Sequence, residues 1–207
     1  MSKQRLNPEL LLLIKKISKD VYLQNNFYLA GGTALVLYFN HRVSLDFFTQ
    51  SEFNINTIQS IILKLDGKIL ISVKGSIHSI INGIKVSFIR YNYDLLKDFK
   101  LINNIKVASV ADIACMKFIA VSQKAEKKDF FDIYEILKHF TIKNIKEFLE
   151  SKYTNSELNL YHITKSLTYF KDAETSPEPI SNNTSDWGTV KNYFIKNENE
   201  FLKVFVQ

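Results

Sequence analysis

Two adjacent glycines and a hydroxyl residue lie where a short predicted strand runs into a predicted helix. Gly31, Gly32 and Thr33 follow the stretch FYLA and open a helical pattern that continues to Phe39. Such a turn presents backbone N–H groups and the positive end of a helix dipole, and glycine lets a phosphate approach the backbone closely. The pattern therefore favours an anion site. It is not a P-loop, because no lysine follows the glycines, and a simple structural turn has the same signature.

An aspartate lies in the next predicted strand, VSLDFF, although aspartate is disfavoured in strands. Alternation along this strand places Ser44 and Asp46 on one face and the apolar residues on the other. A carboxylate beside a phosphate-binding turn is the group that would hold a magnesium ion bridging nucleotide phosphates. The alternative is an ion pair between Asp46 and Arg42, and the planar fork of Arg42 would also suit a phosphate.

Three charged residues in the middle of the chain form a second candidate group. Lys117 lies in an otherwise apolar helical stretch, where its stem could simply extend toward solvent or its charge could neutralise a phosphate. Asp129 and Asp132 lie one helical turn apart in KKDFFDIYE. Asp129 suits the start of a helix, and it is also a candidate general base or organiser of an attacking hydroxyl.

The elements that must position these residues are a mixed α/β set followed by helices. Before residue 92, helical spacing runs from Pro8 to Val21, and two further helices are predicted at 33–39 and 54–65. The predicted strands of this part lie at 27–30, 43–48, 68–75, 76–83 and 84–91. Asn82-Gly83 joins the last two strands as a hairpin signal. Helical patterns then follow near 109–122, 128–140, 144–150 and 156–170, and from 185 onward. We therefore expect an α/β domain over 1–140 and a helical bundle over 141–207.

Composition limits the class of protein. The 207 residues include 46% hydrophobic and 23% charged residues, which is ordinary for a globular protein. The longest aliphatic run near the N-terminus, Leu10 to Ile14, is too short to span a bilayer and lacks the flanks of a signal peptide. A single cysteine, Cys115, excludes an intramolecular disulfide and a cysteine-cluster zinc site. These features predict a cytoplasmic protein with no membrane partner.

The net charge of +6 is unevenly distributed. Residues 1–140 hold 19 Lys and Arg against 12 Asp and Glu, a balance of +7, and residues 141–207 hold 8 Lys against 9 Asp and Glu, a balance of −1. A basic first part favours a polyanionic ligand such as RNA. A lysine-rich surface that only keeps the protein solvated is the alternative.

Several separated stretches resemble one family in order and spacing. LAGGTALVLYFNHRVSLDFF is similar to the opening motif of the AbiEii/AbiGii-type nucleotidyltransferase toxins, and INGIKVSFIRYNY to their central strand. VASVADIACMKFIAVSQKAEKKDFFDIYEIL resembles their later lysine- and aspartate-containing segment, and SLTYFKDAE with DWGTVKNYF resembles their C-terminal helices. The resemblance covers roughly residues 7–195.

This resemblance implies a DNA polymerase β-like nucleotidyltransferase fold with a C-terminal helical bundle domain. It also implies transfer of a nucleoside monophosphate from a nucleoside triphosphate, with magnesium or manganese as the cofactor. Some members of the family modify the 3′ end of tRNA as toxins neutralised by an antitoxin, and others serve in phage defence. A triphosphate, tRNA or another RNA, and a cognate antitoxin are thus the implied partners.

The family's functional residues map onto named positions of this chain. The phosphate-binding turn corresponds to Gly31, Gly32 and Thr33, and Arg42 and Ser44 correspond to the residues that precede the metal site, which makes these five the implied nucleotide-binding residues. The implied catalytic residues are Asp46, which also binds the metal, Lys117 and Asp129.

This chain departs from the family pattern at the metal site. The family's strand carries Asp-x-Asp, whereas SLDFF provides only Asp46, and Ser87 stands where polymerase-like relatives have a third carboxylate. Two-metal catalysis needs a clamp on both the attacking and the leaving oxygen. Three hypotheses therefore stay open: a nucleotidyltransferase with a reduced metal site, a catalytically degenerate relative that binds nucleotide or RNA, and an interaction module that keeps only the fold.

Overall fold

The computed structural model describes residues 8–39, 45–102, 104–154, 158–179 and 185–207, and it has the predicted mixed α/β class. The chain packs as two compact units. Unit 1 comprises Met1–Asp94 and Asp98–Ser109, and unit 2 comprises Leu95–Lys97 and Val110–Gln207. The predicted boundary near residue 140 between a nucleotidyltransferase-like domain and a helical domain stays a prediction.

A seven-stranded mixed sheet forms the centre of unit 1, in the order β3-β4-β5-β2-β1-β7-β6. The strands are β1 (Tyr28–Ala30), β2 (Leu45–Thr49), β3 (Lys68–Val73), β4 (Ser76–Ile81), β5 (Ile84–Arg90), β6 (Lys100–Ile102) and β7 (Ile105–Val107). The pairs β2–β5 and β1–β7 are parallel, and the other pairs are antiparallel. The strands β1 and β2, which come before and after the glycine turn and its helix, are thus central and each has a neighbouring strand on both sides.

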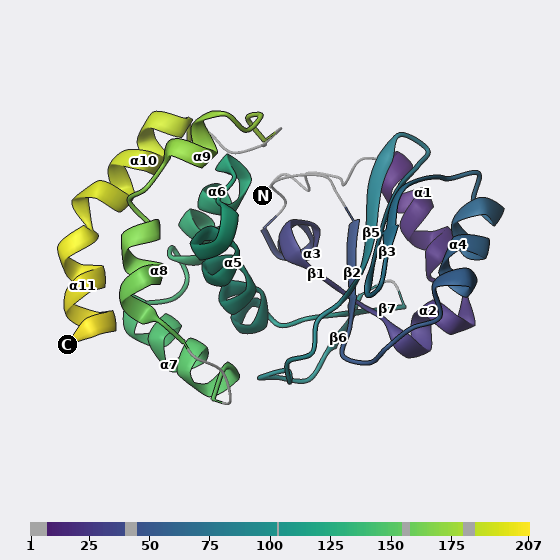
Figure 1. Ribbon diagram of the computed structural model, residues 1–207, viewed down its shortest axis with the longest axis horizontal. Helices are drawn as coiled ribbons and strands as arrows, with labels where there is room; N and C mark the ends of the chain where they lie inside the picture. Colours follow the sequence, from purple (N-terminus) through teal and green to yellow (C-terminus); the bar gives the residue numbers. More distant parts are fainter. Residues whose placement is uncertain (1–7, 40–44, 103, 155–157, 180–184) are drawn as a thin grey trace. The chain divides into compact units, whose positions relative to one another are not determined.

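Helices lie on both faces of this sheet. In Figure 1, α1 (Pro8–Ile17), α2 (Val21–Asn26) and α4 (Ile55–Lys64) lie on one face, and α3 (Gly31–Phe39) lies on the other. An aromatic cluster joins the first face to its helices: the ring of Phe88 stacks on Phe47 at 5.5 Å and meets Phe27 edge-on at 5.4 Å. Burial of these large rings supplies much of the apolar area that holds β2 and β5 in register.

Several local features agree with the sequence pattern. Asn54 caps α4, with its side chain accepting a hydrogen bond from the N–H of Thr57 at 3.2 Å. The predicted hairpin turn between β4 and β5 is confirmed, because Asn82 and Gly83 have φ values of 50° and 74°. Such a turn requires two left-handed residues, which asparagine and glycine adopt at low cost.

Three features differ from the sequence-based expectation. The helical spacing from Pro8 to Val21 is broken, because Asp20 caps a new helix and Val21 is exposed rather than part of the buried stripe. The helix expected from residue 185 onward is two helices, which meet at Asn197. The short β6–β7 hairpin was not predicted, since three-residue strands are below the length at which alternation can be recognised.

Unit 2 is helical. Its helices are α5 (Val110–Lys124), α6 (Lys127–Ile136), α7 (Ile142–Lys152), α8 (Leu160–Ser166), α9 (Lys171–Glu174), α10 (Trp187–Lys196) and α11 (Glu198–Val206). Trp187 anchors the start of α10, with its ring against those of Phe130, Phe131 and Phe170. Among the described residues, none of the helices combines the length and the apolar character needed to cross a bilayer.

A buried ion pair joins α5 to α7. Lys152 Nζ lies 2.8 Å from Asp112 Oδ1, and neither side chain has solvent exposure. The same Asp112 oxygen accepts a hydrogen bond from the N–H of Leu96 at 2.8 Å. Asp112 therefore ties the segment 95–97 and α7 to this helix.

We predict that Lys152→Met destabilises the protein by about 3–5 kcal/mol, because it leaves the Asp112 carboxylate buried without its cation. Lys146→Met is the matched control on the same helix, since Lys146 forms only a 4.0 Å surface pair with Glu150. The free energy of unfolding of the Lys146→Met variant should differ from that of the wild type by less than about 0.5 kcal/mol. Chemical denaturation of both variants tests this, and equal midpoints would contradict it.

Cys115 gives a pH-dependent prediction. Burial raises the pKa of its thiol to about 12, with Asp112 adding to the rise and Lys152 opposing it. Because the thiolate is the reactive form, native protein should not react faster with a disulfide reagent as pH rises from 7 to 9.5. Denatured protein should react faster over that range, since a free cysteine ionises near pH 8.5. A native rate that rises through pH 8.5 would show that the thiol is accessible.

Candidate functional site

The glycine turn begins the candidate site in unit 1. Strand β1 ends at Ala30, and α3 begins at Gly31 with no intervening residue. Gly31 has a φ of +67°, a conformation that side-chain-bearing residues adopt only with strain. Gly32 and Thr33 follow in the first turn, and both are buried. Because first-turn N–H groups have no partner within their own helix, this turn has the geometry of an anion site.

Asp46 lies directly beside this turn. It is paired with Ala30 across the antiparallel β1–β2 ladder, and it is half-buried. Its sequence neighbours Leu45 and Phe47 are buried and point to the opposite face of the sheet. A Cβ atom built on Gly31 would lie 3.4 Å from Asp46 Oδ2. The carboxylate thus faces the glycine, and the structure brings together two groups that the sequence places fifteen residues apart.

A row of polar side chains continues from Asp46 across the neighbouring strands. Ser87 of β5 is in register with Asp46 and is buried. Its Oγ lies 3.1 Å from Nδ1 of His78 on β4, and Nε2 of His78 lies 2.9 Å from Ser76 Oγ. The position expected for a third carboxylate is therefore beside Asp46, and a serine held by a histidine occupies it. No motif or ligand spacing in the sequence pointed to these contacts of His78.

The donor set at Asp46 fits a divalent ion held partly by a ligand. Among the described residues, no group of three or more His, Cys, Asp or Glu side chains is arranged to hold a metal. Magnesium, however, is commonly held by one or two carboxylates together with waters and substrate phosphates. Asp46 beside a predicted phosphate-binding turn would meet that lesser requirement.

A second group of predicted residues lies within unit 2. Lys117 Nζ lies 2.8 Å from Asp129 Oδ1 and 2.7 Å from Asp132 Oδ2, with all three side chains nearly or fully buried. Lys117 comes from α5 and the two aspartates from successive turns of α6. The lysine does not extend to solvent, which was the simpler expectation for it.

The two aspartates are not equivalent. Asp129 Oδ2 also accepts a hydrogen bond from the N–H of Glu126 at 3.3 Å, so it caps α6 while it holds the lysine. Asp132 is fully buried and lies in the interior of α6. Sequence reasoning identified the spacing of the pair but did not assign Asp132 to the site. The cluster holds one lysine against two aspartates of the same helix.

The structure thus brings the predicted residues together in two groups. Gly31, Gly32, Thr33 and Asp46 form the group in unit 1, and Lys117 and Asp129 form the group in unit 2. Arg42 and Ser44 lie outside the described residues. The catalytic and binding roles of all these residues stay predictions.

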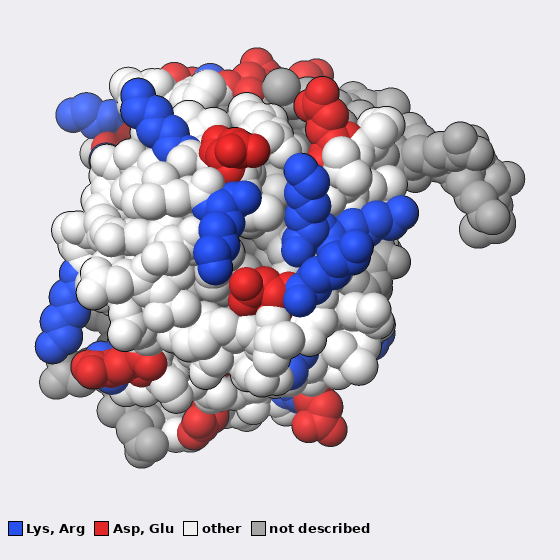
Figure 2. Space-filling view, turned by 90° about the vertical axis from the view of Figure 1, so that its right-hand side faces the viewer, with Lys and Arg blue, Asp and Glu red and all other residues white. Residues whose placement is uncertain are grey.

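Charge is mixed on the face of unit 1 that α1, α2 and α4 cover. Figure 2 shows Lys and Arg side chains interspersed with Asp and Glu on this side of the molecule. On this face the basic excess of the first part of the chain does not form an uninterrupted patch. A polyanion-binding surface therefore has to be argued from particular contacts rather than from net charge.

Comparison with known proteins adds sequence evidence. Residues 79–202 match the family model described as nucleotidyl transferase AbiEii toxin, type IV toxin–antitoxin system. The chain is also 36% identical over 188 residues to an uncharacterized protein of Aquifex aeolicus (strain VF5), with 86% of this chain and 89% of that protein covered.

Two solved structures share the fold. JHP933 from Helicobacter pylori superposes with a TM-score of 0.59 at 16% identity, over 96% of this chain and 94% of that chain. MenT4, a nucleotidyltransferase toxin from Mycobacterium tuberculosis H37Rv, superposes with a TM-score of 0.53 at 12% identity, over 93% of this chain and 86% of that chain. At these identities the likeness concerns the fold, and the predicted nucleotidyltransferase fold is confirmed.

We predict that a side chain at Gly31 weakens binding of triphosphate, and Gly83 provides the matched control. Gly31→Ala places a methyl group 3.4 Å from Asp46 Oδ2 at a φ of +67°, and Gly83→Ala places one at a φ of +74° with nothing within 4 Å. Both variants should lose about 1–2 kcal/mol of stability from the left-handed backbone. Only Gly31→Ala should also weaken binding of inorganic triphosphate, measured by calorimetry. Equal triphosphate affinity in the two variants would contradict a phosphate site at this turn.

Proposed function

Because the chain belongs to the AbiEii nucleotidyltransferase toxin family, we propose that it transfers a nucleoside monophosphate from a nucleoside triphosphate to an RNA acceptor. Transfer RNA is the first acceptor to test, and magnesium or manganese is the proposed divalent ion. The observation that carries the proposal is the approach of the Asp46 carboxylate to the glycine turn, with 3.4 Å between Oδ2 and a Cβ position at Gly31.

The unit 1 group supports binding of the triphosphate. The first turn of α3, from Gly31 to Thr33, provides backbone N–H groups for phosphate oxygens, and the absence of a side chain on Gly31 lets the phosphate approach Asp46. Asp46 would hold the divalent ion. When bound, that ion neutralises phosphate charge and favours the leaving pyrophosphate.

In the unit 2 group, Lys117 is the proposed nucleotide-binding lysine. Its ammonium is desolvated and fixed between two carboxylates, so its position is defined before any ligand binds. We assign Asp129 and Asp132 the role of positioning residues that hold Lys117, with Asp129 organising the nucleotide and the attacking hydroxyl through that lysine.

A second candidate function is binding of nucleotide or RNA without transfer. The observation that favours it is the neutral Ser87 in register beside Asp46, where a further carboxylate would complete a two-metal site. One carboxylate is sufficient for an ion that a triphosphate helps to hold, but it provides only one protein ligand for the two-metal mechanism.

The description of the matched family as a type IV toxin–antitoxin system also supports an antitoxin as a partner of this chain. We propose that the chain acts in the cytoplasm, where triphosphates and tRNA are found, and that a cognate antitoxin relieves its effect on growth.

We predict that the purified protein labels tRNA when supplied with an α-labelled nucleoside triphosphate and magnesium or manganese, and that Asp46→Ala removes at least 99% of the label. A loss of this size corresponds to about 2.7 kcal/mol of transition-state stabilisation. Asp98→Ala is the control, because Asp98 is an exposed carboxylate of the same unit. It should retain the wild-type rate.

The alternative outcomes separate the two candidate functions. Equal labelling by wild type and Asp46→Ala would overturn the role of Asp46. No labelling by the wild type with any of the four triphosphates, together with retained RNA or triphosphate binding, would establish the non-catalytic function instead.

A further inference from the structure

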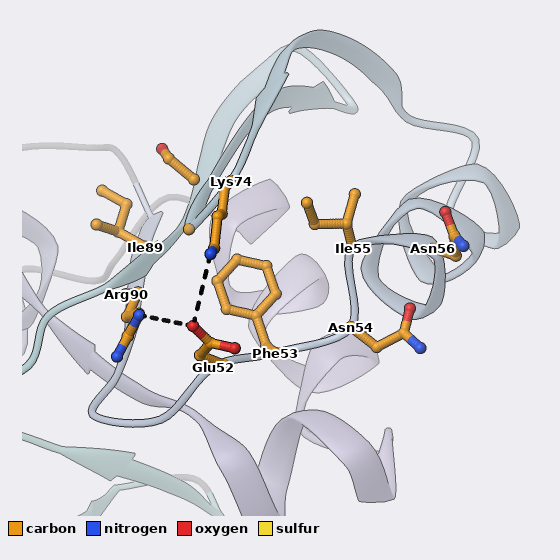
Figure 3. A pocket seen from close by; sticks show the side chains of 10 residues that line it. Glu52, Phe53, Asn54, Ile55, Asn56, Lys74, Ile89 and Arg90 are labelled. Carbon is orange, nitrogen blue, oxygen red and sulfur yellow. Dashed lines mark hydrogen bonds and ion pairs between the residues drawn. The ribbon is translucent and has the colours of Figure 1, made fainter.

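A pocket of about 660 Å³ lies in unit 1 at the end of β5, outside the group formed by the glycine turn and Asp46. It is enclosed by the loop that leads into α4, the turn between β3 and β4, and the last residues of β5. Figure 3 shows the ring of Phe53 pointing into this pocket between the charged pair of Glu52 and Lys74 and the side chain of Ile55. The lining thus combines charged, aromatic and aliphatic groups.

Two cations of the pocket share one carboxylate. Arg90 Nη1 lies 3.0 Å from Glu52 Oε1, and Lys74 Nζ lies 4.0 Å from the same oxygen. The three side chains together carry a charge of +1, and they are 36%, 67% and 88% exposed for Arg90, Glu52 and Lys74. Exposed ion pairs of this kind contribute little to stability. A phosphate could therefore replace Glu52 and engage both the guanidinium fork and the ammonium.

Backbone contacts fix the two segments that carry these cations. Arg90 is in register with Thr49 of β2, and its N–H donates to the carbonyl of Gly75 at 2.7 Å. This bond ties the β3–β4 turn, which carries Lys74, to the end of β5. Gly75 has a φ of +81°, as such a turn requires. The sheet thus sets the backbone positions from which the two cationic side chains extend.

The aromatic wall is also fixed. Phe53 is half-buried, and its ring meets that of the core residue Phe27 edge-on at 5.3 Å. Part of the ring therefore remains available to a ligand. Aromatic rings beside basic side chains are the usual means of holding single-stranded nucleic acid, because each base can stack while its phosphate binds the cation.

The pocket is distinct from the group proposed to bind the triphosphate. The parallel strands β2 and β5 run from the pair Asp46 and Ser87 to the pair Thr49 and Arg90, a distance of about 10 Å for three residues. An odd number of residues places Arg90 and Asp46 on opposite faces of the sheet. The pocket is therefore a site separate from Asp46, on the other face of the sheet.

We propose that this pocket binds one nucleotide of the acceptor RNA, with its phosphate on Arg90 and Lys74 and its base against Phe53. The choice of RNA rests on the function proposed above. A free nucleotide presents the same phosphate and base, so the experiment has one arm for each source. RNA binding without added triphosphate requires no transfer, which keeps failure of this proposal distinct from failure of the transferase proposal.

The experiment measures binding of fluorescein-labelled tRNA and of a labelled twelve-nucleotide single-stranded RNA by anisotropy, without triphosphate, over a series of salt concentrations. Arg90→Gln and Lys74→Gln should each weaken binding about tenfold, as expected for loss of a charge-assisted contact. Each should also reduce the slope of log affinity against log salt by about 0.7. Lys74 is so exposed that its substitution leaves the fold intact, which keeps the test valid if Arg90→Gln folds poorly.

Two further variants sharpen the test. Glu52→Gln removes the carboxylate that competes with phosphate, and it should tighten RNA binding at least twofold. Lys85→Gln is the matched control, since Lys85 is an exposed cation of β5 outside the pocket. It should change RNA affinity less than twofold. Unchanged or weaker binding by Glu52→Gln, or equal effects of Lys74→Gln and Lys85→Gln, would overturn the proposal.

Calorimetry with each nucleoside mono- and triphosphate provides the second arm. Free-nucleotide affinity that is unchanged in Arg90→Gln and Lys74→Gln, with RNA affinity lowered, is the expected result. Loss of free-nucleotide binding with unchanged RNA affinity would overturn the assignment to RNA.

Discussion

The approach of the Asp46 carboxylate to the glycine turn is the interaction on which the site in unit 1 depends. It favours glycine at position 31, because the backbone there has a φ of +67° and a Cβ atom would already be in van der Waals contact with Oδ2 at 3.4 Å. It also requires β1 and β2 to pair in the register that sets Asp46 opposite Ala30. The aromatic packing of Phe47 against Phe88 holds β2 beside β5 from the opposite face of the sheet. The core and the candidate site are therefore two faces of the same strands.

The two groups of predicted residues differ in how their charged side chains are paired. In unit 1 a half-buried carboxylate lies beside a turn that favours anions, an arrangement that a cation and a phosphate together would complete. In unit 2 a buried lysine is already held by two carboxylates. A nearby buried pair, Lys152 and Asp112, has one carboxylate for one lysine and joins two helices.

Local patterns predicted much of the fold and part of the site. The strand, glycine turn and helix around Gly31 were predictable because glycine and alternation act over a few residues, and Asn82-Gly83 identified its hairpin for the same reason. The β6–β7 hairpin was not predictable, since its strands have three residues each. Some contacts depend on helix packing, which no local pattern contains. Examples are the ion pair of Lys152 with Asp112 and the two ion pairs of Lys117 with Asp129 and Asp132. The pocket at Arg90 likewise joins three segments distant in sequence.

The central claim is that Asp46 and the glycine turn together hold a metal–triphosphate. The most direct test is electron paramagnetic resonance of manganese with the full chain and a non-hydrolysable nucleoside triphosphate analogue, comparing wild type with Asp46→Asn. The account predicts manganese bound to the wild-type protein only when the analogue is present, because one carboxylate needs the phosphates as further ligands. It also predicts at least tenfold weaker binding in Asp46→Asn. Manganese affinity that is equal in the two proteins would contradict the account.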